Sequence, residues 1–500
     1  MCYTFTIMQK TASRILQAAV FMVLVAVGAW LRCLCLGDVM PLASEAPTLL
    51  AASVAVESVD YVGLPYGCVS APSLFTRLGG ACAAFFGGTA NGFMTLRSYR
   101  ALPMVLAVLV LALIPALGLR RRGGLFDTAD GPLWAVAFAA CSPALIAGAW
   151  QFDPYSLLTF LSLLFWIAAR SYAQWPGYIS ALTVGFVSSL SLVLEANALW
   201  VILFLLPALP VGVGWRRLCL YWRTLHVALA LAVAAAVWSF AREFFPLEGL
   251  SLPDVHAVMG EGGRVLGMRL LGACCGGLGL IAWAVLSAIG FSRSDRRWAR
   301  VFAVVYPSFF VGAAVFPRGG VFLAPLALLS AVMCGMAVSC IPRDGRRWAI
   351  GNLVLMAQCA VMVFLGHTML ASRVPRAEQK LARATLQQAF RRLPSGFGPH
   401  GVLVVTDSPE NCARLVWPVR HLFLCWQVVA PEAAVGAQLT VVEESFLDRL
   451  PADTARGVIP GRVRLASDTV FRLFCRPSAP PVGTGSAGTV LSVPAEKGAE

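Results

Sequence analysis

Charged side chains are scarce in this sequence of 500 residues. Asp, Glu, Lys and Arg together make up 13% of it, whereas apolar residues make up 58% and the mean hydropathy is +0.75. A soluble globular protein of this length does not need so much apolar surface. The composition therefore predicts a polytopic membrane protein.

The sequence also lacks the motifs of several common sites. None of its 15 cysteines belongs to a CxxC pair or to a Cys/His cluster with zinc spacing, so no metal site is indicated. No Gly-rich phosphate loop is present, so we do not expect a nucleotide-sugar site. No internal repeat is found, which disfavours a transporter built from two related halves.

Many of the cysteines lie in or beside apolar runs, where we interpret them as small hydrophobic residues. Three others, Cys412, Cys425 and Cys475, follow the last run. The sequence leaves open whether two of these three form a disulfide.

Apolar runs occupy most of the first 370 residues. The first run, Ile15–Leu34, follows Lys10 and Arg14 and resembles a signal peptide. Arg32 and Cys33 replace the small residues of a cleavage site, so we interpret the run as an uncleaved anchor. At about 20 residues per crossing, the runs predict about eleven transmembrane helices. Those after the anchor lie near residues 101–119, 132–149, 155–170, 178–194, 197–214, 225–244, 269–291, 301–316, 320–341 and 348–370.

Basic residues are unequally distributed between the loops on alternate sides. If the N-terminus is cytoplasmic, the cytoplasmic loops carry clusters such as Arg120–Arg122 and Arg296–Arg297, and the outer loops carry few basic residues, as the positive-inside rule requires. The formal charge of +14 follows from these clusters, so nucleic acid is not an expected partner. This orientation places on the outer side the loop 37–100, the link 150–154, the loop 242–268 and the tail from residue 367.

The tail has a different composition and predicts a small extracytoplasmic α/β domain over residues 371–477, large enough for a modest core of its own. Residues 376–393 have the pattern of an amphipathic helix, with Leu381 and Leu386 on its apolar face. Strands are expected near 402–405, 422–429, 438–442 and 469–475. The Pro/Gly/Ser/Thr-rich end, 478–500, is expected to be disordered. Residues 1–370 then form the transmembrane domain.

Acidic side chains on the outer side are the candidates for catalysis on a lipid-linked substrate. A carboxylate takes a proton from an attacking hydroxyl or amine while arginines neutralise a phosphate. Asp38 and Glu45 lie in the loop 37–100, and Asp153 lies in a link too short to leave the membrane surface. Pro154 suits the first turn of the next helix, which places Asp153 near the positive end of that helix; an ordinary helix N-cap explains Asp153 equally well.

Several short motifs follow one another on the predicted outer side. They are Arg32 with Leu36-Gly37-Asp38 and Ser44-Glu45-Ala46, then Tyr61-Val62-Gly63-Leu64-Pro65, Ala71-Pro72-Ser73-Leu74-Phe75, Arg97-Ser98-Tyr99-Arg100, Trp150-Gln151-Phe152-Asp153-Pro154-Tyr155, and Arg318 with Val321-Phe322-Leu323-Ala324-Pro325-Leu326. In this order they resemble the GT-C glycosyltransferases, in particular the protein O-mannosyltransferase and aminoarabinose transferase-like group. The resemblance covers roughly residues 10–370, and the tail fits the extracytoplasmic domain that many members carry.

The resemblance implies a mainly α polytopic membrane protein with surface helices in its first extracytoplasmic loop, in a bacterial inner membrane. It implies inverting transfer of a sugar from a polyprenyl-phosphate donor to a glycan, lipid or protein acceptor. No cofactor is implied, and a role for a divalent cation is left open. Glu45 or Asp38 would deprotonate the acceptor and Asp153 would orient it. The implied substrate-binding residues are Arg32, Tyr61, Arg97, Arg100, Arg264 and Arg318.

Three residues depart from the pattern of this family. Ser44 stands where the family has its catalytic aspartate, and a serine cannot act as a base near neutral pH. Ser70 replaces a lysine, and Gln151 replaces an arginine. Two alternatives therefore stay open. One is a catalytically inactive scaffold of the same fold, and the other is a lipid or sugar transporter or flippase, although the predicted spans hold few acids or lysines.

Overall fold

The structure is a computed structural model of the chain. It describes residues 2–475 with the exception of 35, 37–39, 43–44, 58–63, 65–67, 71–72, 88, 91–92, 119–124, 195–197, 214–220, 245–262, 293–296, 317–319, 341–344, 372–375, 392–401, 423–425, 434–438, 452–457 and 465–468. Asp38, Tyr61 and Arg318 lie outside the described residues, as does the end 478–500 that the sequence predicts to be disordered.

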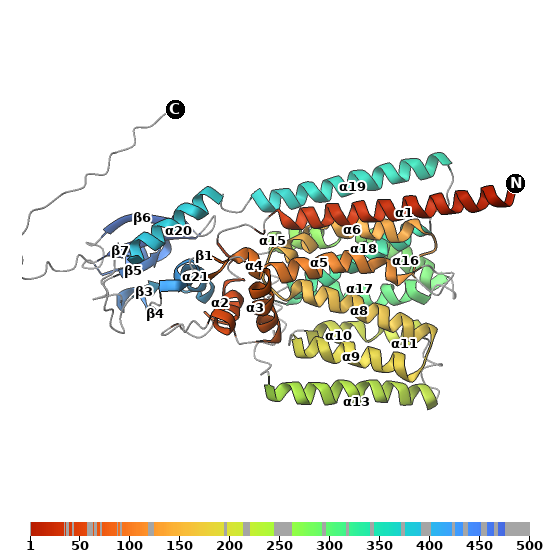
Figure 1. Cartoon of the computed structure of the whole chain (residues 1–500), viewed down its shortest axis with the longest axis horizontal. Coiled ribbons are helices and arrows are strands. Elements are labelled where there is room, and N and C mark those ends of the chain that lie inside the picture. The colour runs from red at the N-terminus through yellow and green to blue at the C-terminus, as the bar shows by residue number, and fades with distance from the viewer. Residues whose placement is uncertain are drawn as a thin grey trace, which may run out of the picture.

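A bundle of apolar helices makes up most of the molecule (Figure 1). Among the described residues, six helices are long and apolar enough to cross a membrane, or up to eight if each of two bent pairs is one span. The chain is a multi-pass membrane protein, as predicted. Every predicted apolar run contains helix, and the number of crossings stays a prediction. The helices are α1 (Cys2–Cys33), α5 (Ala101–Leu113), α6 (Asp130–Cys141), α7 (Pro143–Ala149), α8 (Tyr155–Gln174), α9 (Tyr178–Leu194), α10 (Ala198–Leu205), α11 (Ala208–Val213), α13 (Tyr221–Phe244), α15 (Gly263–Ala273), α16 (Leu278–Ser292), α17 (Arg297–Val315), α18 (Gly320–Ser339) and α19 (Gly345–Ala371).

Two of the predicted spans are bent helix pairs. The axes of α6 and α7 differ by 60°, and Pro143 at the start of α7 cannot donate a backbone hydrogen bond to the preceding turn. The axes of α15 and α16 differ by 58°. Between them, Cys275, Gly276 and Gly277 have positive φ angles of 52°, 67° and 93°, which end the first helix. Length and mean hydropathy do not reveal such breaks, because one or two residues such as Ser142-Pro143 or Gly276-Gly277 change the average of a run of about 20 residues little.

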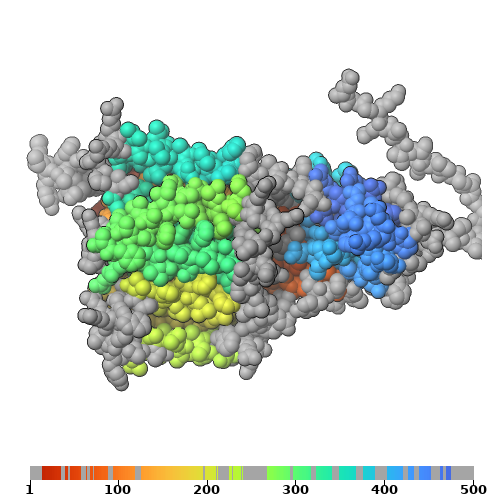
Figure 2. Space-filling view, turned by 180° about the vertical axis from the view of Figure 1, so that it is seen from behind, coloured from red at the N-terminus to blue at the C-terminus, as the bar shows by residue number. Residues whose placement is uncertain are grey.

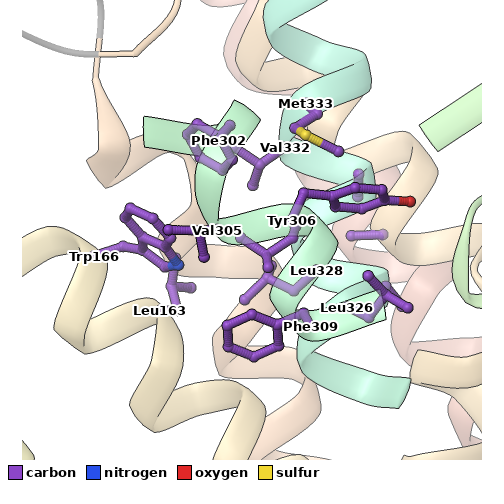
Figure 3. Packing of buried hydrophobic residues seen from close by; sticks show 14 of the residues in the cluster. Leu163, Trp166, Phe302, Val305, Tyr306, Phe309, Leu326, Leu328, Val332 and Met333 are labelled. Carbon is purple, nitrogen blue, oxygen red and sulfur yellow. The ribbon is translucent and has the colours of Figure 1, made fainter. Parts of the chain in front are cut away.

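Aromatic and aliphatic side chains fill the centre of the bundle (Figure 3). Trp166 of α8 stacks on Phe302 of α17, with ring centroids 5.0 Å apart. Next to them, Val305 and Phe309 of α17 face Leu328 of α18 (Figure 3). Lipid tails are as apolar as these side chains, so close packing rather than a hydrophobic driving force holds the helices together.

The first outer loop folds into short elements at one end of the bundle (Figure 1). They are α2 (Ala46–Glu57), α3 (Leu74–Phe86), β1 (Thr89–Ala90), β2 (Phe93–Met94) and α4 (Leu96–Tyr99). A reciprocal capping box starts α3: the backbone N–H of Thr76 donates to Ser73 Oγ, and that of Ser73 donates to Thr76 Oγ1. The surface helices predicted for this loop are present.

The tail forms a five-stranded sheet with helices (Figure 1). The strand order is β4-β3-β5-β7-β6; β3 is parallel to β4 and β5, and β7 is antiparallel to β5 and β6. The elements are α20 (Arg376–Arg391), β3 (Val402–Val405), α21 (Pro409–Val416), a 3-10 helix η3 (Trp417–Leu422), β4 (Trp426–Val428), β5 (Leu439–Glu443), a 3-10 helix η5 (Glu444–Arg449), β6 (Val458–Arg464) and β7 (Val470–Cys475).

Two features of the tail differ from the sequence prediction. The strand β6 is not among the predicted strands, because Pro460 and Gly461 in it are typical of turns. It lies at the edge of the sheet, where proline is tolerated, and its register with β7 is irregular. The helix α20 buries Gln379, Ala382 and Leu386, whereas Leu381 is 67% exposed. The predicted apolar face is therefore wrong for Leu381.

The tail shares its core with the first loop. One cluster of buried side chains contains Leu50 of α2, Phe75 of α3, and Val404 and Leu415 of the tail. The ring of Tyr99 meets that of Trp417 edge-on, with centroids 5.5 Å apart. Figure 2 shows the tail residues, in blue, at one end of the bundle with loop residues, in orange-red, next to them. The sequence predicts that the tail has a core of its own. In the structure, helices of the first loop, which is distant in sequence, complete that core.

Candidate active site at the junction of bundle and loop

The carboxylate of Glu45 joins three segments that are distant in sequence. Glu45 and Arg100 are both fully buried. Arg100 Nε donates to Glu45 Oε1 at 2.7 Å, and Arg100 Nη2 donates to Oε2 at 2.6 Å. The backbone N–H of Phe152 donates to Oε1 at 2.9 Å, and that of Leu42 donates to Oε2 at 3.1 Å.

These four hydrogen bonds occupy all of the roughly four acceptor positions of a carboxylate. Glu45 therefore fixes the start of α2, the start of α5 and the α7–α8 link relative to one another. In this arrangement Glu45 has no lone pair left to accept a proton from a substrate, so its geometry is that of a positioning residue.

Asp153 follows Phe152 directly and is only 4% exposed. The structure thus brings two of the three predicted catalytic acids, Glu45 and Asp153, to the same place. The helix α8 begins at Tyr155 with Pro154 at its N-cap and no side-chain cap hydrogen bond, so Asp153 lies one residue before the cap. The N-cap position is therefore Pro154, and capping of α8 by the Asp153 side chain stays a prediction.

The ring of Phe152 holds the α7–α8 link in position. It is fully buried, stacks on Phe75 with centroids 5.1 Å apart, and meets Tyr99 edge-on at 5.8 Å. Gly79 of α3 lies against this ring, because a Cβ atom built on Gly79 would stand 2.1 Å from Phe152 Cζ. The absence of a side chain at Gly79 is what lets α3 approach the link.

We predict that Gly79→Ala displaces Phe152 and with it Asp153. Overpacking of this kind costs about 1–3 kcal/mol of the free energy of unfolding. Gly177→Ala is the control, since no atom outside its own chain neighbours lies within 4 Å of the added Cβ. Thermal unfolding of the two variants checks this; equal stability of both would contradict the role given to the Phe152 contact.

The other predicted site residues are differently placed. Arg32 is 1% exposed and lies inside the bundle, where Nη1 donates to the carbonyl oxygens of Gly28 and Ala140 and Nη2 to that of Ala139. It connects α1 to α6. A cavity of about 10 Å³, room for one water molecule, lies beside it and is also lined by Ser156 and Thr159.

Two further predicted binding residues lie on described helices. Arg97 on α4 is exposed. Arg264 lies on α15, but its side chain is outside the described residues. Among the described residues, no three His, Cys, Asp or Glu side chains are grouped to hold a metal ion.

A second buried ion pair, which the sequence analysis does not predict, attaches the tail to the loop. Arg420 Nε donates to Glu57 Oε2 at 2.9 Å and Arg420 Nη2 to Oε1 at 2.9 Å. The backbone N–H of Met94 and the hydroxyl of Tyr99 also donate to Oε1. The Arg420 guanidinium lies over the Trp417 ring, 3.8 Å from its centroid. Glu57 is visible in sequence only as one more acid in a loop, and nothing in the sequence pairs it with Arg420.

We predict that Glu57→Gln loosens the tail from the loop. The groups that donate to Glu57 are Arg420, the Met94 N–H and the Tyr99 hydroxyl, so an amide nitrogen would face a donor and Arg420 would lose the negative charge of Glu57. Backbone amide hydrogen exchange in α2 and α21 should become faster, by about 10-fold for each 1.4 kcal/mol by which the free energy of local opening falls. Glu378→Gln is the control, because its pair with Arg464 is half exposed at 3.6 Å. Unchanged exchange in the Glu57 variant would contradict the role assigned to this pair.

The described geometry defines a multi-pass membrane protein with buried acids and arginines where the bundle meets its first loop. Its fold is similar to that of ArnT from Cupriavidus metallidurans, solved bound to undecaprenyl phosphate and in the apo state. The TM-scores are 0.54 and 0.53, the identity is 12%, and the match covers 93% of this chain and 98% of ArnT in both cases. A weaker likeness, with a TM-score of 0.46 and 16% identity, is to the arabinofuranosyltransferase AftD from Mycobacteria, 36% of which is covered.

No protein-family model matches the sequence. No curated protein matches it either. The chain nonetheless shares its fold with ArnT, as the motifs predict for the aminoarabinose transferase-like group. At 12% identity, the likeness is one of fold.

Proposed function

We propose that this protein is a membrane glycosyltransferase that moves a sugar from a polyprenyl-phosphate donor to an acceptor on the extracytoplasmic side. The observation that carries the proposal is that buried Asp153 lies next to Phe152, whose N–H donates to Glu45 of the Glu45–Arg100 pair. This site lies at the end of a helix bundle whose fold is shared with ArnT, which was solved bound to undecaprenyl phosphate. The buried acid supplies a group to orient or deprotonate the acceptor. Exposed Arg97 and the outer-loop arginines supply charge for the donor phosphate.

The proposed roles follow from the hydrogen bonds. Asp153 contacts the acceptor, and Asp38 is the second candidate base. Glu45 holds the α7–α8 link through the Phe152 amide and thereby sets where Asp153 stands. Arg100 holds the Glu45 carboxylate in place through two hydrogen bonds. Arg264, Arg318 and Tyr61 remain proposed donor-binding residues. No cofactor enters these roles.

The proposed orientation follows the distribution of basic residues. Arg170 lies near the end of α8 that is far from Asp153, and Trp298, next to Arg297 at the start of α17, contacts Trp166 of the same helix. Both arginines therefore lie at the end of the bundle away from the α7–α8 link. By the positive-inside rule that end is cytoplasmic. The N-terminus is then cytoplasmic and the tail extracytoplasmic, in a bacterial inner membrane.

The test uses the full chain reconstituted in liposomes. Undecaprenyl phosphate is the binding probe, followed by native mass spectrometry, and undecaprenyl-phosphate-linked hexoses and pentoses are the donor probes. We expect the protein to bind undecaprenyl phosphate and to release undecaprenyl phosphate from at least one donor when the sugar is transferred. Absence of both binding and transfer would reject the proposal.

The saturated carboxylate of Glu45 favours one second candidate, a non-catalytic scaffold of the same fold. A scaffold predicts that undecaprenyl phosphate binds but that no donor is consumed, even when acceptor glycans, lipid A-type glycolipids and proteins are all supplied. The transfer assay therefore separates the two functions directly.

A further inference from the structure

Two cysteines from distant parts of the chain touch each other in the core that the first loop shares with the tail. Cys68 lies in the loop, before α3, and Cys412 lies on α21. Both residues have no exposed surface. Their thiol groups are hydrogen-bonded to each other.

The backbone on each side of this contact is held in place. Two residues after Cys68, the N–H of Ser70 donates to the carbonyl oxygen of Pro47 on α2, and the N–H of Cys412 donates to that of Ser408 at the start of α21. The helices α2 and α21 pack against each other. Arg414, two residues after Cys412, donates from Nε to the carbonyl oxygen of Pro41 at 3.0 Å. The two sulfur atoms therefore face each other across an interface that is fixed by independent contacts.

We propose that Cys68 and Cys412 form a disulfide that joins the first loop covalently to the tail. The inference rests on the extracytoplasmic side proposed above, because disulfides form and persist in oxidising compartments. It also answers the question left open by the sequence, since the proposed partner of Cys412 lies in the loop and not in the tail.

The chemistry requires an oxidant, which is the disulfide of a dithiol oxidase of that compartment. The Cys68 thiolate attacks this disulfide, forms a mixed disulfide and releases one thiolate of the oxidant. The Cys412 thiolate then attacks Cys68 Sγ and releases the second. The two cysteines lose two electrons, the oxidant becomes a dithiol, and the two thiol protons go to the released sulfurs. Because both cysteines are buried in the folded protein, the oxidase reacts with them before the loop and the tail have packed together.

Two other cysteine pairs are in contact within the described residues, but in the bundle. Cys141 of α6 is hydrogen-bonded to Cys359 of α19, and Cys275 to Cys334 of α18. These thiols lie between membrane-spanning helices, away from a water-borne oxidant, and pack as small apolar groups. They are expected to stay reduced and serve as internal references.

The test is a peptide map of the full chain, denatured in N-ethylmaleimide immediately on extraction and digested without reduction. We expect one cross-linked peptide pair containing Cys68 and Cys412, and full alkylation of Cys82, a partly exposed cysteine on α3 of the same loop. Cys68→Ser and Cys412→Ser should each abolish the cross-linked pair, and Cys82→Ser should leave it unchanged.

Alkylated Cys68 and Cys412 in the unreduced chain would overturn the inference. A reporter fused to the C-terminus separates the two ways in which this can happen. If the reporter is extracytoplasmic, the disulfide alone is rejected and the proposed function stands. If it is cytoplasmic, the proposed orientation fails together with the disulfide. If the unmodified protein carries the cross-link but transfers no sugar, the proposed function is rejected and the disulfide stands.

Discussion

Replacing Asp153 with asparagine is expected to lower sugar transfer by about 10²–10⁴-fold, the usual contribution of a positioned general acid or base. Asparagine keeps the size of the side chain but cannot take a proton from the acceptor. Asp153 is 4% exposed and adjacent to the Phe152 amide that Glu45 holds, so its position is set by the fold rather than by solvent. The loss should fall on kcat, and binding of undecaprenyl phosphate should persist, because the groups proposed to bind the donor phosphate are arginines and not Asp153.

Asp127→Asn is the matched control for this variant. Asp127 lies near the opposite end of the bundle, where it accepts a hydrogen bond from Cys340 Sγ at 3.3 Å. The two variants are compared by thermal unfolding, by native mass spectrometry with undecaprenyl phosphate and by transfer from the donor that the unmodified protein uses. If Asp153→Asn folds, binds the lipid and transfers at the unmodified rate, Asp153 has no catalytic part.

Replacing Glu45 with glutamine is expected to destabilise the protein by about 3–5 kcal/mol, as when one partner of a buried ion pair is removed. All four groups that contact this carboxylate are donors, namely Arg100 Nε and Nη2 and the backbone N–H groups of Leu42 and Phe152. An amide must present its own N–H₂ group to some of these donors. It also removes the negative charge that Arg100 Nε and Nη2 contact. Glutamine, although similar in shape, is therefore not a conservative replacement here.

A double-mutant cycle with Arg100→Met isolates the ion pair. The double variant Glu45→Gln/Arg100→Met should lose less stability than the sum of the single variants, because neither charge is then left buried and unpaired. SDS titration in mixed micelles, followed by tryptophan fluorescence, measures the free energy of unfolding. Glu444→Gln is the control, because its pairs with Arg462 and Arg472 are exposed to solvent and contribute little to stability. Additive effects of the two core variants would show that Glu45 and Arg100 are not coupled.

The site was partly visible in the sequence. Glu45 and Asp153 stand out because acids are rare near the membrane-spanning runs, and the order of motifs links them to one outer face. Their separate tasks were not visible. That Glu45 is saturated follows from Arg100 and the backbone of Phe152, and a sequence contains no record of which backbone amide a side chain will meet. Arg97 and Arg100 are likewise equivalent in sequence, but one is exposed and the other is buried.

The sequence by itself determined that the chain crosses a membrane, which segments are helical and roughly where four strands of the tail lie, because hydropathy and periodicity are local properties. Only the tertiary structure decided the burial of the loop helices against the tail, the pairing of Glu57 with Arg420 and the contact of Cys68 with Cys412. These features depend on contacts between residues hundreds of positions apart. Such contacts form only when the loop and the tail meet at the same end of the bundle, and no local pattern encodes that meeting.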